Sequence, residues 1–416
     1  MNLETRIPAE ILSEIFRLLC YEQAIDLGKL ENNSCLAQFP WAVGQVCRHW
    51  RTSLLSCPVL WTRLLLELDP RFCNHSTAYL AEMKRRSAIY LKRSGQLPLT
   101  VTISTAFSGT ETFESPIVTI CNMLLSCSRR WRKADILLPL ASSVNDDALL
   151  KCKGRMPILE SLRITLSAFK DSEDYRNVFE IAPHLTELDM RICYGCTGGW
   201  TFPWEQLTKL RLSTYHAWFA HGTVTELQAF LSQLQNVEEL GFVFDDAAVQ
   251  CLSQCGCPPV HLPCLRFLEA SIVHPGVFSW FQVPLLEHLS LGSVRWDPDS
   301  EGWVDLYHFQ HEILSLVDRS SCRIRQLTLQ YCDIEQIHSV METLANVEEL
   351  YIKNPSERGV SAPYMRTIAE SNDYSYLRNL RVLQVKSRAF LGVEESCETC
   401  RSSLERRCWK LWTTTL

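Results

Sequence analysis

The sequence predicts a mixed α/β protein, in which a small all-α segment at the N-terminus precedes an irregular array of alternating strands and helices. Apolar residues recur at helical spacing near the start of the chain, and an apolar-x-x-Leu-x-apolar phrase returns from Leu159 to Val385. Helical stripes separate several copies of that phrase. One strand–helix unit cannot cover its own apolar face, so we expect stacked units with parallel strands on the concave side and helices on the convex side.

Composition describes a folded protein of 416 residues with 46% hydrophobic and 21% charged residues. The net charge of −6 argues against a nucleic-acid-binding surface. The start of the chain lacks the pattern of a secretory signal, and no apolar run is long enough for a membrane span. The 19 cysteines are therefore expected to be reduced thiols in a protein of the cytoplasm and/or nucleus, with no membrane partner.

Two apolar blocks lie within the first 66 residues. Pro8 suits the first turn of a helix, and residues 11–19 carry an apolar stripe at helical spacing. The pattern resumes at residues 46–54, and residues 59–66 form a last apolar patch. A domain of about 60 residues buries little surface by itself, so this one needs the rest of the chain or a partner. The simpler interpretation is that these residues form the core of a helical cap.

The amino-acid sequences of the two blocks, IPAEILSEIF at 7–16 and AVGQVCRHWRTSLLSCPVLWTRL at 42–64, resemble the F-box. The long spacer between them is similar to the F-box variant of mushroom-forming fungi, and Ile7 stands where the family has Leu. The resemblance implies docking on a Skp-type adaptor and, through it, a cullin, so the protein would be a non-catalytic substrate-recognition adaptor of a ubiquitin ligase. The adaptor-binding residues that it implies are Ile7, Pro8, Ile11, Leu12, Ile15, Phe16, Val46, Cys47, Trp50 and Trp61.

The body of the chain resembles a leucine-rich-repeat protein, because its strand phrase recurs at irregular intervals of roughly 20 to 40 residues. Cys193 and Cys332 fall where that repeat has its Asn or Cys. The copies of the phrase are Leu159-Leu162-Ile164, Leu185-Leu188-Met190, Leu207-Leu210-Leu212, Val237-Leu240-Phe242, Leu265-Leu268-Ala270, Leu286-Leu289-Leu291, Ile324-Leu327-Leu329, Val347-Leu350-Ile352 and Leu380-Leu383-Val385.

Helical patterns between the phrases cover 223–234, 306–317 and 337–344. Upstream of the array, residues 97–103 alternate like a strand and residues 131–138 are expected to carry another. The resulting division is an F-box domain at 1–66, a linker with atypical capping repeats at 67–155, a leucine-rich-repeat-like solenoid at 156–390 and a tail at 391–416.

A target protein is expected to bind the concave face, where the residues between the apolar positions point. Charges of both signs along this face favour a protein partner. Trp200, Trp204, Trp218, Trp296 and Trp303 lie in loop-like segments, where packing onto the repeat edges is favoured over a role as contact anchors. The expected target-binding residues are Asp189, Arg191, Lys209, Arg211, Gln326, Thr328, Gln330, Tyr351, Lys353 and Gln384.

No nucleotide-binding or hydrolase motif occurs, so we expect no enzyme activity, no cofactor or metal and no small-molecule substrate. Two alternatives stay open. The protein could be a repeat scaffold with a vestigial F-box that acts outside any ligase. It could also be an enzyme that uses the region of His308, His311 and Glu312 or a cysteine cluster formed by Cys251, Cys255, Cys257 and Cys264, although neither has a standard metal-site spacing.

Overall fold

The computed structural model shows a mixed α/β protein built on parallel strands. The chain divides into two compact units, Met1–Trp204 and Glu205–Leu416, so the boundary falls within the stretch that was expected to form one solenoid. The structure describes residues 7–22, 25–26, 40–68, 77–105, 115–137, 149–166, 176–192, 200–214, 229–244, 258–271, 275–292, 306–330, 344, 346–353 and 379–386.

The first unit begins with a cluster of short helices, α1 (Ala9–Glu22), α2 (Val43–Val46), α3 (Arg48–Leu55) and the 3-10 helix η3 (Pro58–Trp61). Cys47 separates α2 from α3 because its backbone is extended, and its Sγ accepts a hydrogen bond from the Trp50 amide at 3.4 Å. Gly44 lets the two helices approach, since a Cβ there would lie 3.2 Å from Cδ2 of Leu54. We refer to α1, α2, α3 and η3 as the N-terminal helices.

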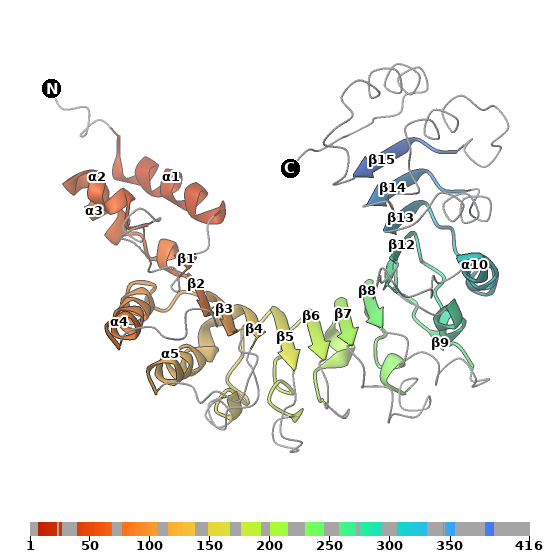
Figure 1. Cartoon of the computed structure of the whole chain (residues 1–416), viewed down its shortest axis with the longest axis horizontal. Helices are drawn as coiled ribbons and strands as arrows, with labels where there is room; N and C mark the ends of the chain where they lie inside the picture. The colour runs from red at the N-terminus through yellow and green to blue at the C-terminus, as the bar shows by residue number, and fades with distance from the viewer. Residues whose placement is uncertain are drawn as a thin grey trace. The chain divides into compact units, whose positions relative to one another are not determined.

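The sheet of the first unit follows chain order and is parallel throughout the strand pairs that the structure describes (Figure 1). Its strands are β1 (Ile25–Asp26), β2 (Arg63–Leu68), β3 (Leu99–Thr105), β4 (Trp131–Leu137), β5 (Ser161–Leu166) and β6 (Glu187–Ile192). The connections contain α4 (Thr77–Arg93), α5 (Ser115–Ser126) and the 3-10 helix η5 (Ser128–Arg130). The helices α4 and α5 pack against each other, and their inward residues are buried together with alternate residues of β2, β3 and β4.

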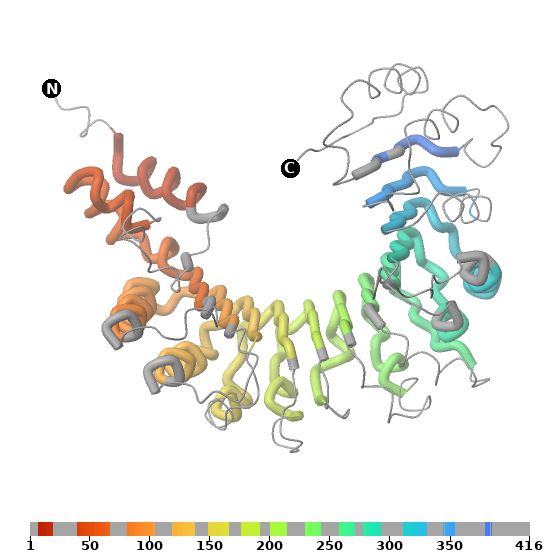
Figure 2. Tube along the Cα trace, in the orientation of Figure 1, coloured from red at the N-terminus to blue at the C-terminus, as the bar shows by residue number. Residues whose placement is uncertain are grey.

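The second unit repeats this construction along its part of the chain (Figure 2). Its main strands are β7 (Lys209–Thr214), β8 (Glu239–Phe244), β10 (Phe267–Ser271), β12 (His288–Gly292), β13 (Gln326–Gln330), β14 (Glu349–Lys353) and β15 (Val382–Lys386). A separate two-stranded parallel ladder joins β9 (Val260–His261) to β11 (Phe281–Gln282). The helical segments are η6 (Trp204–Gln206), which begins at the last residue of the first unit, η7 (Pro275–Trp280) and α10 (Leu306–Ser320).

Within each unit the strands are aligned so that the central apolar residue of one phrase lies beside that of the next. In the first unit Ala134 pairs with Leu162 and Leu162 with Leu188. In the second, the row runs through Leu210, Leu240, Leu268, Leu289, Leu327, Leu350 and Leu383. This register gathers the apolar residues on one face, because successive side chains of a strand point to opposite faces.

The structure confirms that every copy of the apolar phrase forms or leads into a strand, from β5 to β15. The strand-like segments at 97–103 and 131–138 correspond to β3 and β4, and the helical stripe at 306–317 corresponds to α10. Of the other two helical patterns, residues 223–228 and 337–343 lie outside the described residues, whereas residues 229–231 of the first pattern are helical. Trp200 and Trp204 are buried beside Phe202, as the packing interpretation expected, whereas the other three loop tryptophans lie outside the described residues.

Two features of the first unit differ from the expectation. The last apolar patch of the expected F-box domain divides between η3 and β2, so residues 63–68 belong to the sheet. The helices α4 and α5 were not anticipated within residues 67–155. Their apolar residues alternate with charged and small ones less regularly than in the N-terminal stripe, and tertiary packing against the sheet completes them.

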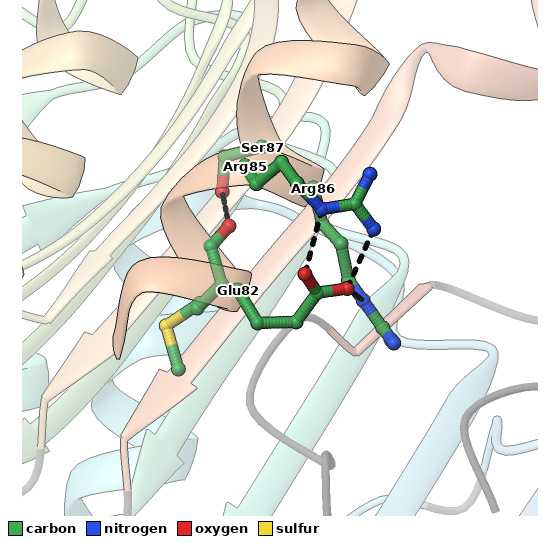
Figure 3. A network of polar contacts seen from close by, with 5 residues as sticks. Glu82, Arg85, Arg86 and Ser87 are labelled. Atoms are coloured by element: carbon green, nitrogen blue, oxygen red, sulfur yellow. Dashed lines mark hydrogen bonds and ion pairs between the residues drawn. The ribbon is translucent and has the colours of Figure 1, made fainter. Parts of the chain in front are cut away.

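A polar network stabilises the exposed side of α4 (Figure 3). Glu82 accepts hydrogen bonds from Arg85 at 2.6 and 2.7 Å and from Nε of Arg86 at 2.8 Å. On the buried side of the same helix, the Ser87 hydroxyl donates to the backbone oxygen of Met83 at 3.0 Å. The hydrogen bond with Arg85 is the main cause that lowers the pKa of Glu82 from 4.5 to about 2.

We therefore predict that Glu82→Gln weakens the acid sensitivity of the first unit. The lowered pKa means that the Glu82 carboxylate stabilises the fold above about pH 4.5 and loses this contribution as the pH falls towards about 2. Because the Glu82 side chain is 34% exposed, screening limits the effect to about 1 kcal/mol. Unfolding monitored from pH 7 to pH 2 measures it, with Glu180→Gln as an exposed control. Unchanged acid sensitivity in Glu82→Gln would contradict the assignment.

Candidate docking surfaces

The helix α1 carries apolar residues on two sides. Leu12 and Phe16 are fully buried against the neighbouring helices, where the Phe16 ring meets the Trp50 ring edge-on at 5.5 Å between centroids. A second set one residue away points outward and comprises Ile11 (52% exposed), Ile15 (40%), Leu18 (60%) and Leu19 (48%). Their spacing of i, i+4, i+7 and i+8 places them along one stripe of the helix. We call this stripe the outer face of α1.

Exposed apolar residues are concentrated on the N-terminal helices and the residues that flank them. Of the twelve large apolar side chains that are exposed among the described residues, eight lie between Ile7 and Val59. Besides the outer face of α1, they are Ile7, Val46, Leu55 and Val59. Single exposed apolar residues are ordinary, but a concentration of this kind typically marks a binding surface.

The expected adaptor-binding residues separate into three groups by burial. Ile7, Pro8, Ile11, Ile15 and Val46 are exposed, and Cys47 and Trp50 are half-buried. Leu12, Phe16 and Trp61 are inaccessible, and the indole nitrogen of Trp61 donates to the backbone oxygen of Leu54 at 3.4 Å. In this conformation these three side chains form the core of the N-terminal helices and offer no surface to a partner. Leu18, Leu19, Leu55 and Val59 were not among the expected contacts, although the helical spacing from Ile11 could have included the first two.

The second candidate surface is the polar face of the strands in each unit, which consists of the residues between the apolar positions. In the first unit this face contains three charged residues, Asp135, Arg163 and Asp189, which lie directly beside one another on β4, β5 and β6. We call them the charged row. Arg163 of β5 donates from Nε to Asp189 of β6 at 2.8 Å and from Nη1 to Asp135 of β4 at 3.4 Å. Burial raises the pKa of Asp135 in spite of the nearby Arg163 guanidinium.

In the second unit an ion pair joins β7 to β10 across the intervening strand β8. Arg211 of β7 lies across Gly241 of β8, and its Nη2 donates to Glu269 of β10 at 2.9 Å. A Cβ on Gly241 would lie 3.0 Å from Cγ of Arg211, so the absence of a side chain at this position makes room for the arginine. Beside this pair, Lys209 and Glu239 approach to 2.7 Å.

The polar face changes character at β12 to β14, where uncharged groups predominate. Ser290 and Thr328 are buried although they occupy polar-face positions, and Gln330 donates to the Ser290 hydroxyl at 3.4 Å. Tyr351 donates to Glu349 at 3.0 Å, and burial followed by this contact raises the pKa of Tyr351. Because the side chains of Ser290 and Thr328 are buried, they are better placed to position their neighbours than to contact a partner.

The expected target-binding residues lie on strands at polar-face positions, with different accessibility. Arg191, Lys209, Arg211 and Lys353 are exposed, Asp189, Gln326, Gln330, Tyr351 and Gln384 are half-buried, and Thr328 is buried. The sequence argument missed Asp135 and Arg163, which complete the charged row in the first unit. Arg163 directly follows the central Leu162 of its phrase, so the same rule that selected Asp189 could have found it.

A polar pocket of about 310 Å³ opens where β4, β5 and β6 begin. It adjoins the charged row, because Lys133, Ser161 and Glu187 stand two residues before Asp135, Arg163 and Asp189 on the same strands. Its lining residues are Lys133, Glu160, Ser161, His184, Thr186 and Glu187. Such a pocket could accept a polar side chain of a partner.

The residues considered for metal chemistry are only partly described. Within the described ranges no three His, Cys, Asp or Glu side chains are grouped as metal ligands. Cys251, Cys255 and Cys257 lie outside those ranges, Cys264 is half-buried, and His311 is exposed at 4.0 Å from Glu312. Of the helices that the structure describes, none has the length and apolar character needed to cross a membrane.

Comparison with known proteins gives no relative: no family model matches the chain, and no curated protein matches it.

The charged row leads to a prediction about Asp135 and Asp189. The raised pKa of Asp135 means that its favourable contribution is present at acidic pH and is lost as the pH rises through that pKa, so the ionised form is a cost at pH 7. We expect Asp135→Asn to stabilise the first unit at pH 7 by up to about 1 kcal/mol, with allowance for screening. Asp189→Asn should destabilise it instead, because it removes the shorter ion pair with Arg163. Urea unfolding of both variants at pH 7 measures the difference, and a loss of stability in Asp135→Asn would contradict it.

Proposed function

We propose that this protein is the substrate-recognition adaptor of a Skp–cullin–F-box ubiquitin ligase. In this proposal the N-terminal helices are the F-box that docks on the Skp-type adaptor, and the parallel-stranded body is a leucine-rich-repeat solenoid that holds a target protein. The observation that carries the proposal is the outer face of α1, in which four large apolar side chains remain exposed beside a helix side that is already buried. The resemblance of residues 7–16 and 42–64 to the F-box supplies the class of partner.

An apolar helix face is suited to this docking role because its burial in an interface contributes about 25 cal/mol for each Å² removed from water. The Glu14–Arg17 ion pair on the same helix, at 2.6 Å, gives the surface a polar border. Such an arrangement of an apolar centre and a polar rim is typical of protein interfaces.

The polar faces of the strands in the two units support the second part of the proposal. The ion pairs that the structure describes on these faces already join charges of both signs within the protein, so a partner must match an existing pattern. Complementarity of this kind confers selectivity for one protein more than raw affinity. The protein would make and break no covalent bond. It would raise the effective concentration of the target beside a ubiquitin-conjugating enzyme, in the cytoplasm or nucleus.

A second candidate is a repeat scaffold with a vestigial F-box, which binds a partner through its sheets and acts outside any ligase. The burial of Leu12, Phe16 and Trp61 favours it, because core packing alone accounts for these parts of the F-box-like pattern. The exposed outer face of α1 is what this alternative leaves without a role.

We predict that Ile11→Asp combined with Ile15→Asp lowers the affinity for the Skp-type adaptor at least about 100-fold, because two charges would be buried in the apolar interface. Both side chains are exposed, so the fold should survive. Calorimetric titration with purified adaptor measures the affinity. Replacement of Phe16 is unsuitable for this test because its side chain is fully buried.

Ile181→Asp is the matched control, since Ile181 is 56% exposed in the same unit but lies away from the N-terminal helices. It should bind the adaptor like the unaltered protein. Absence of binding by the folded, unaltered protein would reject the ligase proposal and leave the scaffold.

A further inference from the structure

The N-terminal helices are joined to the rest of the first unit through a cluster of three aromatic rings. Trp61 at the end of η3 and Tyr90 of α4 are both fully buried, with ring centroids 4.9 Å apart. Trp41, which precedes α2, meets Trp61 at 5.6 Å and Tyr90 at 6.1 Å. All three contacts are edge-to-face, the geometry in which aromatic pairs attract one another.

Arg93, the last residue of α4, covers this cluster. Its Cζ lies 4.4 Å from the ring centroid of Trp61 and 5.3 Å from that of Trp41. Burial lowers the pKa of Arg93, which is consistent with a guanidinium partly withdrawn from water, where it still carries its charge. Cation–π attraction is strongest when the cation is desolvated in this way.

A second arginine also holds the end of α4. Arg130, the residue before β4, donates from Nη2 to the Ser94 hydroxyl at 2.7 Å and from Nε to the backbone oxygen of Leu97 at 3.0 Å. Gly95 ends the helix with a φ of 58°, a conformation that glycine adopts without strain. The end of α4 is therefore bonded to the start of β4.

These contacts form a continuous path from the buried side of α1 to the sheet. Phe16 packs on Trp50 of α3, Trp61 donates to the backbone oxygen of Leu54 at the end of α3, and the Trp61 ring meets Tyr90 and Arg93. Ser94 then carries the path to Arg130 and β4.

We propose that Arg93 is a positioning residue, which holds the N-terminal helices in one orientation relative to β3 and β4 by stacking on Trp61 and Trp41. The orientation would be fixed before any partner binds. A fixed orientation would keep a docked adaptor at a set position relative to the polar face of the same sheet. This use of the orientation rests on the proposed function, whereas the role of Arg93 in fixing the orientation does not.

Hydrogen exchange of the full-length protein, followed by mass spectrometry, tests the proposal. Arg93→Gln removes the cation but retains a good helix former. We expect amides of α1 and α3 to exchange about tenfold faster in this variant, because a desolvated cation–π contact is lost. Amides of β4 should exchange at the unaltered rate. In Arg93→Lys, amides of α1 and α3 should exchange faster than in the unaltered protein and more slowly than in Arg93→Gln. The lysine ammonium keeps the cation–π attraction but cannot stack as a plane.

Lys84→Gln is the matched control, because Lys84 is an exposed cation on the same helix and lies outside the polar network of Glu82. It should leave exchange in α1 and α3 unchanged. The proposal is overturned if Arg93→Gln behaves like Lys84→Gln, or if exchange rises equally in α1, α3 and β4. Failure of adaptor binding in the earlier titration would reject the proposed function and would leave this result standing.

Discussion

The in-register parallel pairing of the strands is the constraint on which the rest of the structure depends. It places one central apolar residue of each phrase beside the next, so within each unit one face of the strands collects the apolar residues and the other collects the polar ones. A shift by one residue would exchange the two faces. The inward residues of α4 and α5 are buried together with the apolar residues of β2 to β4, whereas α10 packs against η7 and β11. The positions of Arg163 and Arg211 follow from the strand alignment.

The N-terminal helices bury some of their apolar residues in a core and leave others exposed. Leu12, Phe16 and Trp61 supply the core that so short a segment needs, and the aromatic cluster extends that core to α4. Leaving the outer face of α1 exposed reduces solubility without stabilising the isolated chain. That cost suggests a requirement other than folding, which is why the outer face carries the proposed function and the buried stripe does not.

The sequence patterns predicted the positions of the strands better than they predicted which residues of the candidate docking surfaces are exposed. The phrase from Leu159 to Val385 located its strands because period-two burial and a fixed Leu leave one consistent register. The sequence could not show which stripe of α1 faces inward, since Ile11 and Leu12 are equally apolar and only the packing of α3 decides between them. Nor could it show that Gly241 makes room for Arg211, or that Thr328 is buried on the polar face, because both depend on neighbouring strands that are distant in the chain.

The buried cysteines of the first unit have a consequence for experiments on its dynamics. Burial raises the pKa of Cys121 to about 12 and that of Cys152 to about 11, so at neutral pH almost none of either thiol is the reactive thiolate. Both side chains lie among the apolar residues that α5 and the segment before β5 bury. A thiol reagent can therefore modify them only when this region opens, and the rate of their modification reports the frequency of local unfolding without an introduced label.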